Sequence, residues 1–107
     1  MNEFTCRARI VGDHIVFDVR GDLDAATHDR LVSAATPWLT PGARVFVDCS
    51  GIMFIDSRGM RSLLELYHLA SQTGADLMLT AVPHAVSRTF QLAGIEGFFT
   101  VDRLHSQ

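Results

Sequence analysis

Hydrophobic and polar positions alternate near the start of the chain with the period of a β-strand. Residues 4–10 and 15–19 are two such runs, and the Gly-Asp pair at 12–13 between them predicts a hairpin turn. The spacing of apolar residues then becomes helical over residues 31–39. Pro37 falls inside this helical segment, so we expect its last turn to be irregular.

The rest of the chain alternates apolar strands with helices. Residues 44–49 and 77–82 are expected strands whose apolar residues do not alternate with polar ones, which is typical of strands that are covered on both faces. Each run precedes a segment of helical periodicity, at 57–72 and 83–94, and a short edge strand is expected at 98–101. The order β-β-α-β-α-β-α-β predicts an α/β fold, in which a β-hairpin is followed by βα units. Right-handed crossovers would place a mixed, mostly parallel sheet against the helices.

Length and composition indicate a single domain over residues 1–107. The hydrophobic fraction of 48% and the charged fraction of 20% are typical of a soluble globular protein. No apolar run approaches the ~18 residues that span a bilayer. The first residues lack the apolar core of a signal peptide, so we expect a cytoplasmic protein without a membrane partner. The net charge is −3 and the basic residues are scattered, which argues against nucleic-acid binding.

Several kinds of chemistry are excluded or disfavoured by residue type. All nine basic residues are arginine, so a P-loop lysine, a Schiff-base lysine and a lysine general base are absent. Cys6 and Cys49 lie far apart in apolar surroundings and are expected to be free, buried thiols. Asp22 and Asp24 alone are weak evidence for a metal, and no Cys/His spacing matches a zinc site. We therefore predict neither a metal nor a cofactor.

Polar residues gather in the loops that follow the second and third strands. Asp22 and Asp24 follow the second strand, whereas Ser50, Asp56 and Ser57 follow the third. Because the carboxyl ends of parallel strands share one edge of a sheet, we expect the two loops to approach one another. Ser57 would then lie at a helix N-terminus, where free N–H groups and the helix dipole favour an anion.

Ser57 has three interpretations at this point. It could be an N-cap, since Ser and Asp are preferred caps and turn residues. It could be a nucleophile, although the elbow G-x-S-x-G needs Gly at position 55, where this chain has Ile, and the histidines show no pattern for a base. It could be phosphorylated by a partner, which adds about −1.5 to −2 charge and would weaken docking beside carboxylates without unfolding the domain.

Two segments resemble the signature motifs of STAS domains. Residues 21–27, GDLDAAT, resemble the motif G-E/D-L-D-x-x-T, and residues 47–59, VDCSGIMFIDSRG, resemble D-L-S-G-V-x-F-I-D-S-x-G. Residues 83–86 and 92–95 match the later pattern P-x-x-V and L-x-G-L. The resemblance covers nearly the whole chain in the right order. A stand-alone domain of this length is similar to a bacterial anti-sigma-factor antagonist.

The resemblance implies a non-enzymatic partner switch in transcription regulation and stress response. The unphosphorylated protein would bind an anti-sigma factor that is also a serine kinase with a histidine-kinase-like ATPase fold, and so free the sigma factor. The kinase would then phosphorylate Ser57, the acceptor by motif position, and a phosphatase would reset it. The expected partner-binding residues are Asp22, Asp24, Ala26, Met53, Asp56, Arg58, Gly59 and Arg61.

The chain departs from many family members directly after the acceptor. Small residues are usual there, whereas this chain has Arg58 and Arg61. These arginines are either solvated, or contact the partner or the phosphate, or mark a copy that is not phosphorylated. The alternative functions are a non-switching STAS scaffold subunit of a lipid-transporting ABC system or stress-signalling complex, and a small hydrolase that uses Ser57. A homodimer formed through exposed apolar residues is a further alternative.

Overall fold

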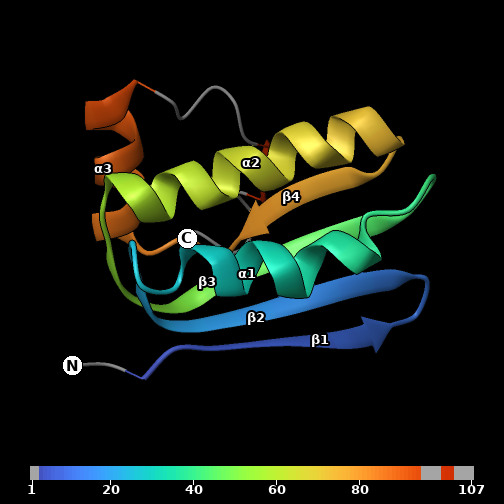
Figure 1. The fold of residues 1–107 in the computed structure, drawn as a ribbon, viewed down its shortest axis with the longest axis horizontal. Helices are drawn as coiled ribbons and strands as arrows, with labels where there is room; N and C mark the ends of the chain where they lie inside the picture. The colour runs from blue at the N-terminus through green and yellow to red at the C-terminus, as the bar shows by residue number, and fades with distance from the viewer. Residues whose placement is uncertain (1–2, 95–99, 103–107) are drawn as a thin grey trace.

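Five strands and three α-helices form one α/β domain in the computed structural model, which describes residues 3–94 and 100–102 (Figure 1). The order along the chain follows the predicted hairpin and βα units. The elements are β1 (Thr5–Val11), β2 (His14–Leu23), α1 (His28–Ala35), the 3-10 helix η1 (Thr36–Trp38), β3 (Arg44–Ile55), α2 (Ser57–Thr73), β4 (Asp76–Thr80), α3 (His84–Ala93) and β5 (Thr100–Asp102).

The strands lie in the sheet in the same order as in the chain, β1-β2-β3-β4-β5. β1 pairs with β2 in the antiparallel direction through the predicted hairpin, and the remaining neighbours are parallel. α1 and α2 lie side by side on one face of the sheet, and α3 lies near the N-terminal end of α2 (Figure 1). The predicted mixed, mostly parallel sheet is therefore confirmed.

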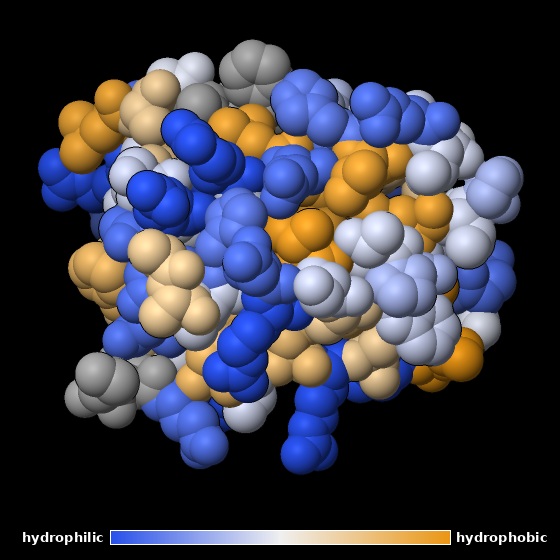
Figure 2. Space-filling view, in the orientation of Figure 1, coloured by the Kyte–Doolittle hydropathy of each residue, from blue (hydrophilic) through white to orange (hydrophobic). Residues whose placement is uncertain are grey.

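The core lies between the sheet and the helices. Alternate residues of β2 and β3 point into it, among them Phe17, Val19, Val45 and Val47, which are at most 1% exposed. The outer surface over α1 and α2 is hydrophilic over much of its area, with separate hydrophobic patches (Figure 2). Burying each large apolar side chain contributes roughly 1.5–3 kcal/mol, so this layer is the main source of stability.

The third strand differs from its prediction in two ways. Arg44 is exposed, and buried and partly buried residues alternate along 45–49, so in the described part of the chain this strand is fully covered on one face only, and cover on both faces is wrong. The strand also continues to Ile55, which places Ser50 in the strand and not in a loop. Its register against β2 shifts twice, as at β-bulges. These extra residues are held by pairing with β2, which also extends further than predicted and includes Asp22.

The helix boundaries agree more closely with the sequence pattern. α1 ends before Pro37 and gives way to a 3-10 turn, which confirms the predicted irregularity. Gly74 and Gly94 end α2 and α3 in the left-handed conformation, as expected of glycine C-caps. The strand predicted at 98–101 falls partly outside the described residues, and β5 is described from Thr100. None of the helices in the described ranges combines the length and apolar character needed to cross a membrane.

Candidate functional site

Ser57 is the first residue of α2 and is exposed. The residue before it, Asp56, has extended backbone geometry, and its Oδ1 accepts a hydrogen bond from the Gly59 N–H at 2.9 Å. Asp56 is therefore the N-cap, and the interpretation of Ser57 as the cap is wrong. Among the described residues, the Ser57 hydroxyl has no hydrogen-bond partner. A free hydroxyl is thus presented at the positive end of a 17-residue helix.

Replacing Asp56 with alanine is expected to lower the free energy of unfolding by about 1 kcal/mol, because the Gly59 N–H loses its acceptor. Urea unfolding of the purified domain measures this change. Asp56→Asn is the matched control, since asparagine caps about as well as aspartate but carries no charge. Equal destabilisation by both variants would contradict the cap and point to the charge of Asp56.

The start of α2 packs directly on the end of β2. Gly59 is buried there, and a Cβ added to it would lie 2.1 Å from the Leu23 carbonyl oxygen and 2.7 Å from the carbonyl carbon. The Asp56 N–H also donates a long hydrogen bond of 3.4 Å to the Leu23 carbonyl oxygen. The predicted approach of the two loops is confirmed. Because Gly59 is buried, we expect it to shape the surface around Ser57 without touching a partner.

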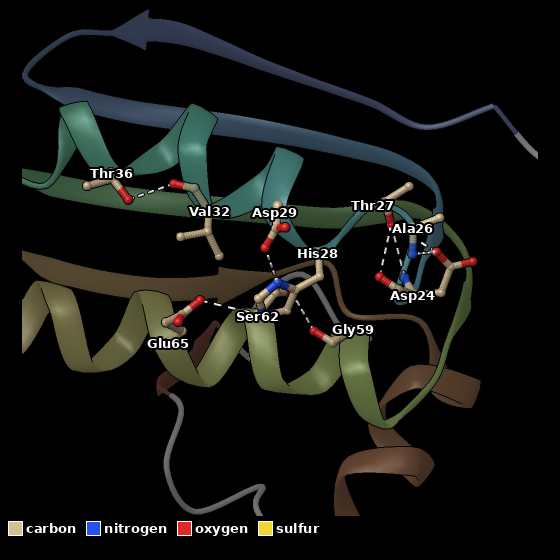
Figure 3. Close-up of polar contacts among 10 residues, drawn as sticks. All are labelled: Asp24, Ala26, Thr27, His28, Asp29, Val32, Thr36, Gly59, Ser62 and Glu65. Atoms are coloured by element: carbon tan, nitrogen blue, oxygen red, sulfur yellow. Dashed lines mark hydrogen bonds and ion pairs between the residues drawn. The ribbon is translucent and has the colours of Figure 1, made fainter.

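The turn between β2 and α1 is held by Thr27 and Asp24 (Figure 3). The buried Thr27 hydroxyl accepts from the Asp24 N–H at 3.0 Å and donates to the Asp22 carbonyl oxygen at 2.8 Å. The Asp24 carboxylate accepts from the Ala26 N–H at 3.0 Å. Thr27 occupies the N-cap position of α1, yet its side chain makes no cap hydrogen bond. Its hydroxyl closes the acidic turn instead, a role that the motif letters did not reveal.

The other predicted site residues differ in exposure. Asp22, Asp24 and Asp56 are partly buried, whereas Ala26, Arg58 and Arg61 are exposed. Met53, near the end of β3, is 68% exposed, and its neighbour Phe54 is 51% exposed. Phe54 was missed as a surface residue, because the apolar run 52–55 does not by itself show which of its side chains face solvent. The end of β3 therefore adds two apolar side chains to the surface that precedes Ser57.

The thiols are poorly suited to nucleophilic chemistry. Burial raises the pKa of Cys6 to about 11 and that of Cys49 to about 12, so both remain protonated thiols at neutral pH. Cys49 is fully buried as predicted, whereas Cys6 is only partly buried. In the described ranges, no three His, Cys, Asp or Glu side chains come together as a metal site requires.

The comparisons with known proteins agree with this architecture. The model of the STAS domain matches residues 5–106, so the chain belongs to the STAS domain family. A putative anti-sigma factor antagonist from Thermotoga maritima has the same fold, with a TM-score of 0.78 and 17% sequence identity over 90% of this chain and 84% of that chain. The phosphorylated form of SpoIIAA, a Bacillus cell fate determinant, matches at a TM-score of 0.66 and 14% identity, over 94% of this chain and 91% of that one.

The same fold also occurs inside a larger protein. The murine anion transporter Slc26a9 matches at a TM-score of 0.74 and 17% identity, over 89% of this chain but only 17% of the transporter. At such identities the structural matches establish the fold alone. The function of this chain must therefore be argued from its own surface.

Proposed function

We propose that this STAS domain is an anti-sigma-factor antagonist that acts by binding and not by catalysis. In its unphosphorylated form it binds an anti-sigma factor that is also a serine kinase, and thereby releases the sigma factor. Phosphorylation of Ser57 by that kinase ends the interaction, and a phosphatase restores it. The chain belongs to the STAS family, and its fold is similar to that of proteins described as anti-sigma-factor antagonists. These two findings support a function of this general kind.

The free hydroxyl of Ser57 is the observation that carries the proposal. An acceptor serine must reach a kinase active site without breaking the fold, and Ser57 is exposed and has no hydrogen-bond partner in the described part of the chain. The structural role that a serine could have at this helix end is already filled by Asp56. Adding a phosphate at the first helical residue is also compatible with the helix dipole.

The surface beside Ser57 suits a partner that is released by phosphorylation. Met53 and Phe54 are exposed apolar side chains near the end of β3, which leads into α2, and Ala26 is exposed in the turn that follows β2. Docking on apolar side chains removes water from the contact, and a phosphate in such a contact would lose its hydration. We therefore expect this surface to bind the unmodified domain and to reject the phosphorylated one.

Incubation with ATP and the cognate anti-sigma kinase is expected to add one phosphate to the domain, at Ser57. Intact-mass spectrometry counts the phosphates and phosphopeptide mapping places them. Ser57→Ala should take up none, whereas Ser71→Ala should be modified like the wild type, because Ser71 is also exposed on α2 but near its other end. A phosphate at another residue, or modification of Ser57→Ala, would show that the acceptor is wrongly assigned.

The fold match to a transporter favours one alternative, a STAS scaffold subunit that does not switch. Affinity capture from the native cell separates the two functions. The antagonist is expected to capture a kinase with an ATPase fold, and the amount captured should fall when Ser57 is phosphorylated. A scaffold would instead capture a transporter ATPase or a larger signalling complex, whatever the state of Ser57.

A further inference from the structure

The exposed side of α2 carries a row of residues that begins at Ser57. Arg61 and Glu65 follow it at intervals of four residues, and both are exposed. Residues four apart on a helix are neighbours, so each member of the row can reach the next. Arg61 therefore has two possible partners along the helix, one on each side.

Glu65 is directed toward α1 (Figure 3). Its Oε2 lies 3.5 Å from Nε2 of His28, an electrostatic contact longer than an ordinary hydrogen bond. Nδ1 of His28 lies 2.9 Å from the carboxylate of Asp29. Glu65 is also C-terminal to Arg61, which is the less favourable order for an ion pair on a helix. In the described part of the chain, Arg61 has no carboxylate partner.

Helix geometry directs Arg61 toward Ser57. Side chains on an α-helix tilt toward its N-terminus, so we expect the side chain of Arg61 to lie over the turn that contains Ser57. Arg58 is also exposed, but it follows Ser57 directly, and adjacent residues do not face each other on a helix. The two arginines of the first turns are thus not equivalent. A cation near a helix N-terminus is also mildly unfavourable to the dipole, so their presence is not explained by helix stability.

We infer that Arg61 is the specific partner of the phosphate on Ser57 and that Arg58 is not. This inference rests on the proposed phosphorylation of Ser57. The guanidinium can form a bidentate, charge-assisted pair with phosphate oxygens. The pair would neutralise part of the phosphate charge and hold the group against the helix. Arg61 thereby sets how strongly phosphorylation weakens docking, and its removal would enlarge the switch.

Phosphorus NMR titration of phosphoserine at position 57 tests this assignment. The phosphoserine is introduced during protein synthesis, so that no kinase is needed. An opposite charge nearby lowers the second pKa of the phosphate below its ordinary value of about 6. We expect Arg61→Gln to raise this pKa by about 0.5 units relative to the unsubstituted domain, and the matched variant Arg58→Gln to raise it by less than half as much. Arg61→Lys, which keeps the charge but cannot form the bidentate pair, should restore only part of the difference.

Equal shifts in Arg61→Gln and Arg58→Gln would overturn the inference, because they would indicate general electrostatics and no specific pair. The absence of any shift in Arg61→Gln would overturn it as well. Both arginines are exposed, so the variants are expected to fold, and circular dichroism checks this. Because the phosphate is introduced synthetically, these outcomes do not depend on a kinase. Failure of the kinase experiment with Ser57 would reject the proposed function and leave this measurement unaffected.

Discussion

Alanine at position 59 is expected to lower the free energy of unfolding by about 2–4 kcal/mol. Two effects oppose each other at this site. Alanine stabilises a helix over glycine by about 1 kcal/mol. Against this, the new Cβ would lie 2.1 Å from the Leu23 carbonyl oxygen, which belongs to the backbone and cannot turn aside as a flexible side chain could. The steric term is larger, so the end of β2 must move away from α2.

Urea or thermal unfolding of Gly59→Ala measures this effect, with a melting temperature expected to fall by about 10 °C or more. Ser71→Ala is the matched control, because Ser71 is exposed on the same helix and the change is expected to stay within about 0.5 kcal/mol. A Gly59→Ala variant as stable as the wild type would mean that the end of β2 can move away from the start of α2 with little loss of folding free energy. Their close approach would then not hold the surface around Ser57 in place.

Phosphorylation of Ser57 is expected to weaken binding of the anti-sigma kinase by a factor of about ten to a thousand. At ~5 Å, a pair of like unit charges costs roughly 1 kcal/mol in water and about 3 kcal/mol at a partly shielded surface. A few such contacts, with the lost hydration of the phosphate, account for a change of this size. The partly buried carboxylates of Asp56 and Asp24 add to this repulsion, whereas the exposed Arg58 and Arg61 offset part of it.

Isothermal titration calorimetry with the kinase and the phosphorylated domain measures the loss of affinity. Phosphoserine at position 71 is the control, since fourteen residues of helix place it roughly 21 Å from Ser57, beyond the Debye length of about 8 Å at physiological salt. It should leave the affinity nearly unchanged. Ser57→Asp, which adds a single negative charge, should bind more weakly than the wild type but more tightly than the phosphorylated domain. Equal affinity of the phosphorylated and unmodified domains would place the docking surface elsewhere.

The regular elements could be predicted from sequence because their signals are local. Apolar spacing located α2 within one residue, and Pro37 and Gly94 marked an irregular turn and a helix end. The end of β3 could not be located in this way. Ser50 and Gly51 interrupt its apolar pattern, and the strand continues past them only because β2 pairs alongside. Residues 52–55 therefore read as a connecting segment until their partner strand is known.

For the site, the order of residues alone was enough to place Ser57 at the start of a helix, near the acidic turn, within the motifs of a STAS domain. Tertiary structure decided how each side chain is used. Asp56 and not Ser57 caps the helix, Thr27 closes the acidic turn, and Gly59 admits the backbone of Leu23. A sequence motif shows which residues occur together. Which hydrogen bonds they form depends on which donors and acceptors the folded backbone brings close to one another. That geometry is set by the packing of α2 against β2, which joins segments more than thirty residues apart.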